Sequence, residues 1–204
     1  TFHTVGDSHC AEGWPRYVAP HWYRGLLCHN AHRIELSSLE PPIREGDAVC
    51  FCLGEIDCRC HVAKHCTRDT PHRVVIDGIL DRYFGHLGPQ LSALALRVQV
   101  FIYNVIPPVR LDNGPPGRYV ACVGSDEDRL AYTSYFNACL RTRCAEAGYV
   151  FFDVYDKYAD ADGFLSPALS RDRVHISDGQ AIEELLCRFG PWERSTPHGD
   201  AVRR

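Results

Sequence analysis

The segment Ala48-Val49-Cys50-Phe51-Cys52-Leu53 is a continuous apolar run with the length of one β-strand, and it leads directly into Gly54-Glu55-Ile56-Asp57. A strand that is apolar at every position is typical of a parallel sheet, because helices cover both faces of such a sheet. The chain begins with a similar run, Phe2 to Val5, which is rich in residues that favour strands and ends at Gly6. These two segments predict a parallel sheet at the centre of the fold.

Segments with strand and helix patterns alternate along the rest of the chain. Further strands are expected over 33–36, 98–105 and 149–154. Apolar residues at helical spacing predict helices over 10–27 and 74–87, over 125–147 between a Ser125 cap and a Gly148 stop, and after Ser177, with Gln180 three residues later. Strands that alternate with helices build βαβ units, so the sequence predicts an α/β fold with about five parallel strands and helices on both sides.

Length and composition are those of one ordinary globular domain. With 204 residues, of which 45% are hydrophobic and 24% charged, the chain is long enough to bury a core. We expect a domain over 1–190, a loop over 112–117 and a polar tail over 191–204. Because the sequence starts at Thr1 rather than at methionine, we expect it to be a domain cut from a larger polypeptide.

Charge and hydropathy argue against two classes of partner. A formal charge of −4 gives no broad basic field, so nucleic acid is not expected to bind. The most apolar stretch, 91–106, contains Arg97 and Gln99 and is too short and too polar to span a bilayer. No basic segment followed by an apolar one opens the chain, so no signal peptide is expected.

Eleven cysteines are many for this length, and their number is odd. Their spacing fits no small disulfide framework. Cys50 and Cys52 lie within the predicted buried strand, where cysteine behaves as a small hydrophobic residue. We therefore expect mostly free thiols and a reducing, cytoplasmic compartment.

Two polar motifs at opposite ends of the chain carry the strongest chemical signal. Gly6-Asp7-Ser8-His9 follows the first strand, and Asp172-Arg173-Val174-His175 precedes the last predicted helix. Ser8 as nucleophile, His175 as base and Asp172 as the group that orients the base would form a complete set for acyl transfer. Alternatively, Ser8 caps a helix, Asp172 pairs with a neighbouring arginine, and His175 is an exposed loop residue.

Other polar residues follow strands in the same way. Gly54 to Asp57 comes directly after the strand at 48–53, and Asn104 lies near the end of the strand at 98–105. Ligands of open parallel sheets collect beyond the carboxyl ends of the strands. We therefore expect Ser8, Asp57 and Asn104 to meet at one edge of the sheet.

The order of these motifs resembles the SGNH (GDSL-type) hydrolase superfamily over nearly the whole chain. The first block matches at Gly6-Asp7-Ser8, and the last matches at Asp172 and His175. The resemblance implies a flavodoxin-like, three-layer α/β/α sandwich with a catalytic Ser8, His175 and Asp172. It also implies that Gly25 is the second-block glycine, whose backbone N–H would stabilise an oxyanion together with that of Ser8.

The third block departs from the family pattern Gly-x-Asn-Asp, because Ile56 stands where the oxyanion-binding asparagine belongs. Losing one such donor typically costs about 10²–10³ in rate. Arg59, two residues past Asp57, is the candidate substitute. Gly54 to Arg59 resembles a divergent branch often attached to glycan-modifying enzymes, which makes Glu55, Asp57 and Arg59 expected pocket residues. A structural salt bridge between Asp57 and Arg59 is the alternative.

A cluster of cysteines and histidines follows this block: Cys58, Cys60, His61, His65 and Cys66. His61 and His65 share a helix face at i,i+4, which is one way to bind zinc. The cysteine spacing fits no standard zinc module, so no metal is expected. We expect His61, and His9 beside the serine, to contact substrate instead.

These observations favour a serine esterase or O-acyltransferase that acts on an acylated carbohydrate without a cofactor. Three aromatic residues soon after the serine, Trp14, Trp22 and Tyr23, could line an acyl or sugar pocket, although core packing is expected for at least two of them. The first alternative is a catalytically weak or inactive SGNH-like module that binds a glycan for a partner domain. The second is a zinc-binding interaction domain, which rests on the Cys/His cluster alone.

Overall fold

The computed structural model describes residues 1–111, 121–190 and 192. Five parallel strands form one sheet in the order β2-β1-β3-β4-β5. Their bounds are Phe2–Gly6 for β1, Ala19–Trp22 for β2, Ala48–Cys52 for β3, Gln99–Tyr103 for β4 and Val150–Phe152 for β5. This strand order is that of flavodoxin-like folds. The predicted α/β fold with about five parallel strands is confirmed.

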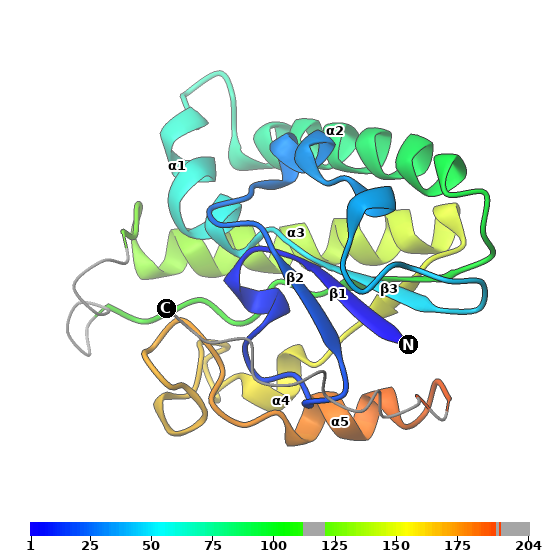
Figure 1. Ribbon diagram of the computed structural model, residues 1–204. Coiled ribbons are helices and arrows are strands. Elements are labelled where there is room, and N and C mark those ends of the chain that lie inside the picture. Colours follow the sequence, from blue (N-terminus) through cyan, green and yellow to red (C-terminus); the bar gives the residue numbers. More distant parts are fainter. Residues whose placement is uncertain (112–120, 191, 193–204) are drawn as a thin grey trace.

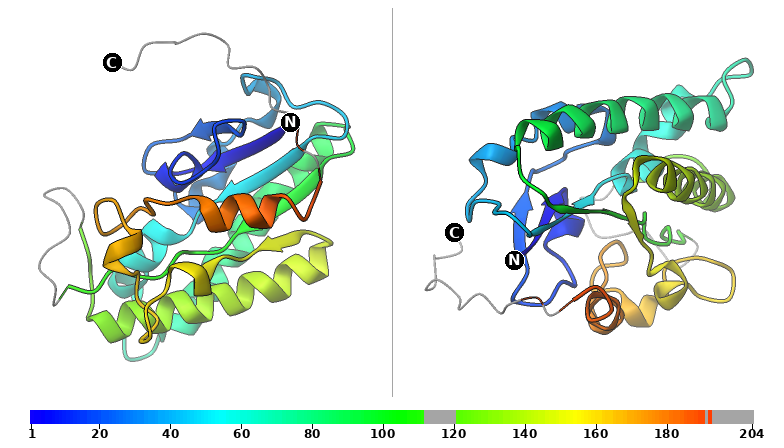
Figure 2. Two further views of the ribbon diagram at one scale, coloured as in Figure 1. Left: turned by 90° about the horizontal axis from the view of Figure 1, so that it is seen from below. Right: turned by 90° about the vertical axis from the view of Figure 1, so that its right-hand side faces the viewer.

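Helices cover both faces of the sheet and give the molecule three layers (Figure 1, Figure 2). One face packs against α1 (Val62–His65), α2 (His72–Ala93) and α3 (Asp126–Ala147). The other face packs against α4 (Tyr155–Tyr158) and α5 (Gln180–Leu186). The apolar run of β3 explains this arrangement: Val49 and Phe51 pack into the first core and Cys50 and Cys52 into the second.

Two segments expected from sequence differ in the structure. The segment 10–27 is not one helix, because it contains the strand β2 and the short 3-10 turn η1 (Ser8–Cys10). Pro20 lies within β2, which is an edge strand and can accommodate a residue without an N–H donor. The expected strand at 33–36 is replaced by the 3-10 turns η2 (Cys28–Arg33) and η3 (Leu36–Ser38).

The expected helix boundaries are found for α3, but the expected cap of α5 is not. Ser125 caps α3 through a reciprocal capping box with Asp128, and Gly148 ends it with a left-handed backbone (φ 70°). In contrast, Ser177 does not cap α5, whose first turn begins after Gly179. Gly179 is required there because a Cβ would lie 1.9 Å from the Gly13 carbonyl oxygen. Close packing of two backbones, rather than a side-chain cap, therefore sets the start of α5.

The expected loop at 112–117 lies outside the described residues, as does the expected tail at 191–204 except for Trp192. The indole of Trp192 packs on Phe2, with ring centroids 5.1 Å apart, and its Nε1 donates to the Leu186 carbonyl (3.1 Å). No helix among the described residues is both long and apolar enough to cross a bilayer.

All eleven cysteines lie in the described part of the chain, and none of them forms a disulfide there. Most are buried, and the thiols that are at least partly accessible are Cys66, Cys122, Cys139 and Cys187. Cys50 and Cys52 pack within the core below the sheet, as their positions in the strand predict.

We therefore predict that a thiol reagent labels at most these four cysteines in the native protein. Under denaturing conditions without reductant, labelling should rise to all eleven, because unfolding exposes the buried thiols. Quantitative mass spectrometry of the labelled protein measures both numbers. Recovery of a single free thiol after denaturation would instead indicate five disulfides, which this structure does not contain.

Candidate active site

The turn that carries Ser8 depends on a close approach between β1 and β3. A Cβ at Gly6 would lie 2.0 Å from the Cys52 carbonyl oxygen, so only glycine fits the end of β1. The Asp7 N–H then donates to that carbonyl (3.2 Å), and the Asp7 side chain caps η1 by accepting from the His9 N–H (2.9 Å). Asp7 and not Ser8 is the cap, which leaves the half-buried Ser8 hydroxyl available for other contacts.

Ser8, His175 and Asp172 form a hydrogen-bonded chain at the carboxyl edge of the sheet. The Ser8 Oγ lies 2.7 Å from the His175 Nε2, and the His175 Nδ1 lies 2.7 Å from the Asp172 Oδ2. The structure thus brings together all three residues that the sequence pairs for acyl transfer. Arg171, the alternative partner of Asp172, lies farther from the same oxygen (3.8 Å) and pairs more closely with Glu12 (2.8 Å).

The Asp-x-x-His loop is shaped around the Asp172 carboxylate. Its Oδ1 accepts from the N–H groups of Val174 (3.0 Å) and His175 (2.8 Å), and Arg173, which lies between Asp172 and Val174, has a left-handed backbone (φ 74°). Burial alone would raise the pKa of Asp172, but these N–H groups and the His175 ring lower it to about 2. The carboxylate is therefore charged at any working pH and fixes the orientation of the imidazole.

His9 lies beneath this loop rather than on the substrate side. The ring is buried (5% exposed) and packs against His175, with ring centroids 4.9 Å apart. Its Nδ1 lies 2.9 Å from the Asp7 Oδ1, and its Nε2 lies 3.3 Å from the Val174 carbonyl oxygen. Both partners are acceptors, and only a doubly protonated imidazole donates from both nitrogens. The expected substrate contact of His9 is therefore replaced by a link between the serine turn and the histidine loop.

The charge on His9 has a clear electrostatic source. Burial alone would lower the pKa of the imidazole, but the Asp7 carboxylate, with smaller contributions from Glu55 and the Val174 carbonyl, raises it to about 9. His9 is thus an imidazolium at neutral pH. This residue is adjacent to Ser8 in sequence, but no local pattern indicates that it reaches Val174, which is 165 positions away.

Two backbone N–H groups near the serine are available to a ligand. In the part of the chain that the structure describes, neither the Ser8 nor the Gly25 N–H has an acceptor. Gly25 is exposed, has a left-handed backbone (φ 66°), and follows β2, the neighbour of β1 in the sheet. Trp22 at the end of β2 pairs with Gly6, so the Gly25 loop and the Ser8 turn leave the same edge on adjacent strands.

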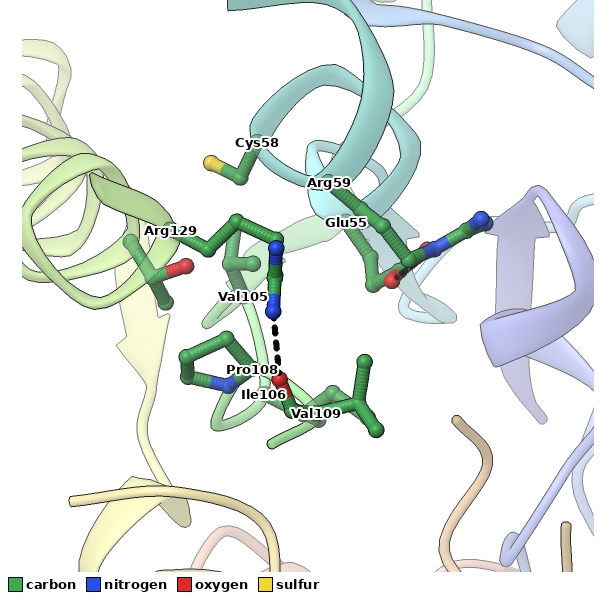
Figure 3. Close-up of a pocket in the computed structure, with 9 residues that line it drawn as sticks. Glu55, Cys58, Arg59, Val105, Ile106, Pro108, Val109 and Arg129 are labelled. Carbon is green, nitrogen blue, oxygen red and sulfur yellow. Dashed lines mark hydrogen bonds and ion pairs between the residues drawn. The ribbon is translucent and has the colours of Figure 1, made fainter. Parts of the chain in front are cut away.

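The third block has a structural arrangement different from either one expected. Arg59 does not pair with Asp57; it donates to both carboxylate oxygens of Glu55 (2.6 and 3.1 Å) and to the Ala121 carbonyl (2.5 Å). Figure 3 shows the Arg59 side chain running alongside Glu55. Because each guanidinium nitrogen already has a protein acceptor, the structure gives no support to Arg59 as the replacement for the missing asparagine.

Asp57 is completely buried at the start of the π-helical turn η4 (Asp57–His61). Its Oδ2 accepts from the Cys28 N–H (3.0 Å), whereas its Oδ1 has no hydrogen-bond partner in the described part of the chain. Burial raises the pKa of Asp57 to about 7, against the opposing effect of the Cys28 N–H. Asp57 therefore braces the segment that follows Gly25 and stays out of contact with Arg59.

Asn104 also differs from its expected role as a substrate contact. Its side chain is buried (1% exposed), donates to the Val105 carbonyl (2.9 Å) and accepts from the Val154 N–H (2.9 Å). It therefore joins the ends of β4 and β5. Buried amides of this kind are satisfied within the protein and hold loops at the sheet edge.

Arg129 is a buried residue that sequence reasoning missed. From α3 it donates to the carbonyls of Gly124 (2.7 Å) and Val109 (3.2 Å), and it pairs with Asp126. Figure 3 shows the guanidinium reaching the Val109 carbonyl beside a small cavity that Glu55 also lines. The only local signal is its i,i+3 spacing from Asp126. It fixes the segment after β4 near the third block.

His61 lines a separate, larger cavity rather than the surroundings of Ser8. The cysteines of the same segment include Cys58 and Cys60, which are buried. Within residues 1–111, 121–190 and 192, no group of three or more His, Cys, Asp or Glu side chains has an arrangement that could hold a metal ion.

Comparisons with known proteins give structural matches only. Comparison with models of protein families gives no match, and comparison with curated proteins gives none. Among solved structures, a GDSL-like lipase from Bacteroides thetaiotaomicron is 16% identical (TM-score 0.61; 92% of this chain and 86% of that chain covered). An extracellular lipase from Streptomyces rimosus is also 16% identical (TM-score 0.54; 92% and 98% covered).

A third solved structure, of the acetyl xylan esterase AlAXEase, is 15% identical (TM-score 0.55; 93% of this chain and 99% of that chain covered). At these identities the likeness concerns the fold, and all three alignments span nearly the whole described domain. The chain has the three-layer fold of GDSL-type lipolytic hydrolases.

Proposed function

We propose that this protein is a serine esterase or O-acyltransferase of the SGNH type that acts on an acylated carbohydrate. The observation that carries the proposal is the hydrogen-bonded chain from Ser8 through His175 to Asp172. Its spacing is that of a nucleophile, a base and an orienting carboxylate ready for proton transfer. The fold shared with GDSL-like lipases and an acetyl xylan esterase supports ester chemistry.

In the proposed mechanism the Ser8 Oγ attacks the ester carbonyl while His175 takes the hydroxyl proton. Asp172 keeps the Nδ1 proton directed at itself and stabilises the imidazolium that forms. The N–H groups of Ser8 and Gly25 stabilise the tetrahedral oxyanion. His175 then returns the proton to the departing alcohol. Water or a sugar hydroxyl, activated by the same imidazole, releases the acyl group and restores Ser8.

A carbohydrate substrate is supported by an exposed aromatic residue beside the serine turn. Trp22 is 60% exposed and pairs in the sheet with Gly6, two residues before Ser8. Large exposed indoles next to a site commonly provide a flat contact surface, and sugar rings present C–H faces that suit it. Trp14, by comparison, stacks on Phe2 in the core, with ring centroids 5.8 Å apart.

The second candidate is a weakly active or inactive module that binds glycans for an attached glycan-modifying domain. The specific observation that favours it is Ile56, which cannot donate a hydrogen bond. Arg59 is engaged by Glu55 and by the Ala121 carbonyl, so it does not take the place of the asparagine donor. Between these two candidates, we propose an esterase whose oxyanion receives hydrogen bonds from two backbone N–H groups only. Its rate should be lower by about 10²–10³ than that of an enzyme with three oxyanion donors.

The first test replaces the nucleophile. Ser8→Ala should abolish labelling by a fluorophosphonate probe and lower aryl acetate hydrolysis by about 10³-fold or more, because the group that forms the acyl-enzyme is gone. The matched control is Ser134→Ala, an exposed serine on α3, which should leave both unchanged. Intact mass spectrometry and a steady-state assay measure the two effects. Equal labelling of wild type and Ser8→Ala would remove the enzymatic proposal.

The second test concerns the imidazolium of His9. His9→Phe keeps the ring but removes both N–H donors, so the His175 loop loses its link to Asp7. We expect kcat to fall about 10–100-fold with a small change in KM, as misplaced catalytic groups produce. His72→Phe, at the start of α2, is the control.

The pH profile separates this positioning role from general loss of structure. In the wild type, kcat should fall as pH rises through about 9, because neutral His9 has only one N–H to donate. The contribution of His9 to the free energy of unfolding should be complete below about pH 6.5, the pKa of histidine in the unfolded chain. It should be lost as the pH rises through about 9, the pKa of His9 in the folded protein. Asp7, Glu55 and His175 are the titratable groups facing the ring. An alkaline limb that persists in His9→Phe would contradict the assignment.

The third test separates the two roles considered for Arg59. Arg59→Ala leaves Glu55 buried (side chain 12% exposed) without its cation, so the free energy of unfolding should fall by about 3 kcal/mol. Arg97→Ala breaks a comparable pair with Glu45 whose arginine is 94% exposed, and should leave the free energy of unfolding nearly unchanged because solvent screens the pair. Turnover by the folded fraction of both variants should stay within about 3-fold of the wild-type value. A loss near 10²-fold in Arg59→Ala at unchanged stability would restore Arg59 as an oxyanion donor.

A further inference from the structure

A second cavity, away from the Ser8 turn, lies between the third block and α2. Its volume is about 440 Å³, within the range of about 300–1,000 Å³ typical of small-molecule sites. The apolar part of its wall comes from α2 and includes Val75 and Ile79. The polar part consists of six residues: His29, Asp57, His61, His65, Thr70 and Arg82.

One guanidinium and three imidazole rings converge on this cavity from four separate segments, because His29 belongs to η2, His61 to η4, His65 to α1 and Arg82 to α2. Arg82 forms no ion pair in the part of the chain that the structure describes. Burial lowers the pKa of His29, and the nearby Arg82 and His65 lower it further. Mutual repulsion of this kind is relieved when an anion binds among the groups.

The floor of the cavity contains the one carboxyl group of the lining, Asp57. It is completely buried, and its Oδ1 has no hydrogen-bond partner among the described residues. A buried polar atom without a partner is costly, so a ligand group that completes its hydrogen bonding is favoured. With a pKa raised by burial to about 7, Asp57 takes up a proton near neutrality and can then donate to an oxyanion instead of repelling it.

We infer that this cavity binds an oxyanion group carried by a sugar, and that it recognises the acidic part of a glycan substrate. Arg82 supplies the positive charge, the three histidines supply imidazole N–H donors, Asp57 supplies the buried hydrogen bond, and the Val75 and Ile79 side chains pack against the sugar ring. The choice of a sugar as carrier rests on the proposed function. The anion preference rests on the lining alone.

A direct contact couples the cavity to the proposed oxyanion loop. The Cys28 N–H donates to the Asp57 Oδ2 (3.0 Å), and Cys28 follows Gly25 by three residues in the same segment. A ligand that binds at the Asp57 Oδ1 therefore contacts the same carboxyl group that accepts a hydrogen bond from the segment after Gly25. Occupancy of the cavity and the position of the Gly25 N–H are linked through this one side chain.

The test measures binding by calorimetry on the Ser8→Ala protein, so that turnover does not interfere. The probes are glucuronate, glucose 6-phosphate, glucose and inorganic phosphate. At least one acidic sugar should bind about 10-fold or more tightly than glucose and than inorganic phosphate, as a charge-assisted hydrogen bond provides. Arg82→Gln and His61→Gln should each weaken that binding about 10-fold, whereas Arg73→Gln, on the same helix but outside the cavity, should not.

Three results would overturn the inference. If glucose and both acidic sugars bind with equal affinity, the cavity does not prefer anions. If inorganic phosphate binds as tightly as the acidic sugars, the cavity does not recognise the sugar. Equal losses in Arg82→Gln and Arg73→Gln place the site elsewhere. Aryl acetate hydrolysis by the Ser8-containing protein is measured in parallel. Activity without acidic-sugar binding contradicts only the cavity assignment, and binding without activity contradicts only the proposed esterase.

Discussion

The contact between the end of β1 and the Cys52 carbonyl is the constraint on which the site depends. Only glycine fits at position 6, and this lets the Asp7 N–H reach the neighbouring strand while its carboxylate turns the chain into η1. Three consequences follow from that single approach. Ser8 faces the loop that carries His175, the Ser8 N–H is left without an acceptor among the described residues, and Asp7 holds a cationic His9 beneath His175.

The polar residues of the third block make their contacts within the protein. Ile56 has no side-chain hydrogen-bond donor, and Asp57 and Arg59 each bond to other parts of the chain. Asp57 is buried under the Cys28 N–H, and Arg59 is held by Glu55 and Ala121. The polar residues of this block therefore hold the segment that follows Gly25 and the backbone at Ala121. In the proposed mechanism, chemistry at Ser8 would then rely on backbone donors, whose geometry is fixed by the fold rather than by a side chain.

Sequence reasoning predicted the features whose signals are local. The run at 48–53 and the capping pattern at Ser125 each specify their own structure, and β3 and α3 form as expected. The predictions of a helix at 10–27 and a strand at 33–36 were wrong. An edge strand and 3-10 turns form there instead, held by contacts with distant elements. Within the site, the pairing of Ser8 with His175 was predicted from motif order. The bond of His9 to Val174 and the pairing of Arg59 with Glu55 were not, because neither leaves a pattern in the sequence.

The hydrogen bond between Ser8 and His175 joins residues 167 positions apart, and His175 lies on the last loop before α5. During synthesis, all five strands therefore leave the ribosome before the base does. A nascent chain can assemble the complete sheet with its serine turn in place and still lack any means to deprotonate the hydroxyl. Under the proposed mechanism, ester chemistry would therefore begin only after the segment that carries His175 folds against the second face of the sheet. The order of synthesis would then set the onset of reactivity.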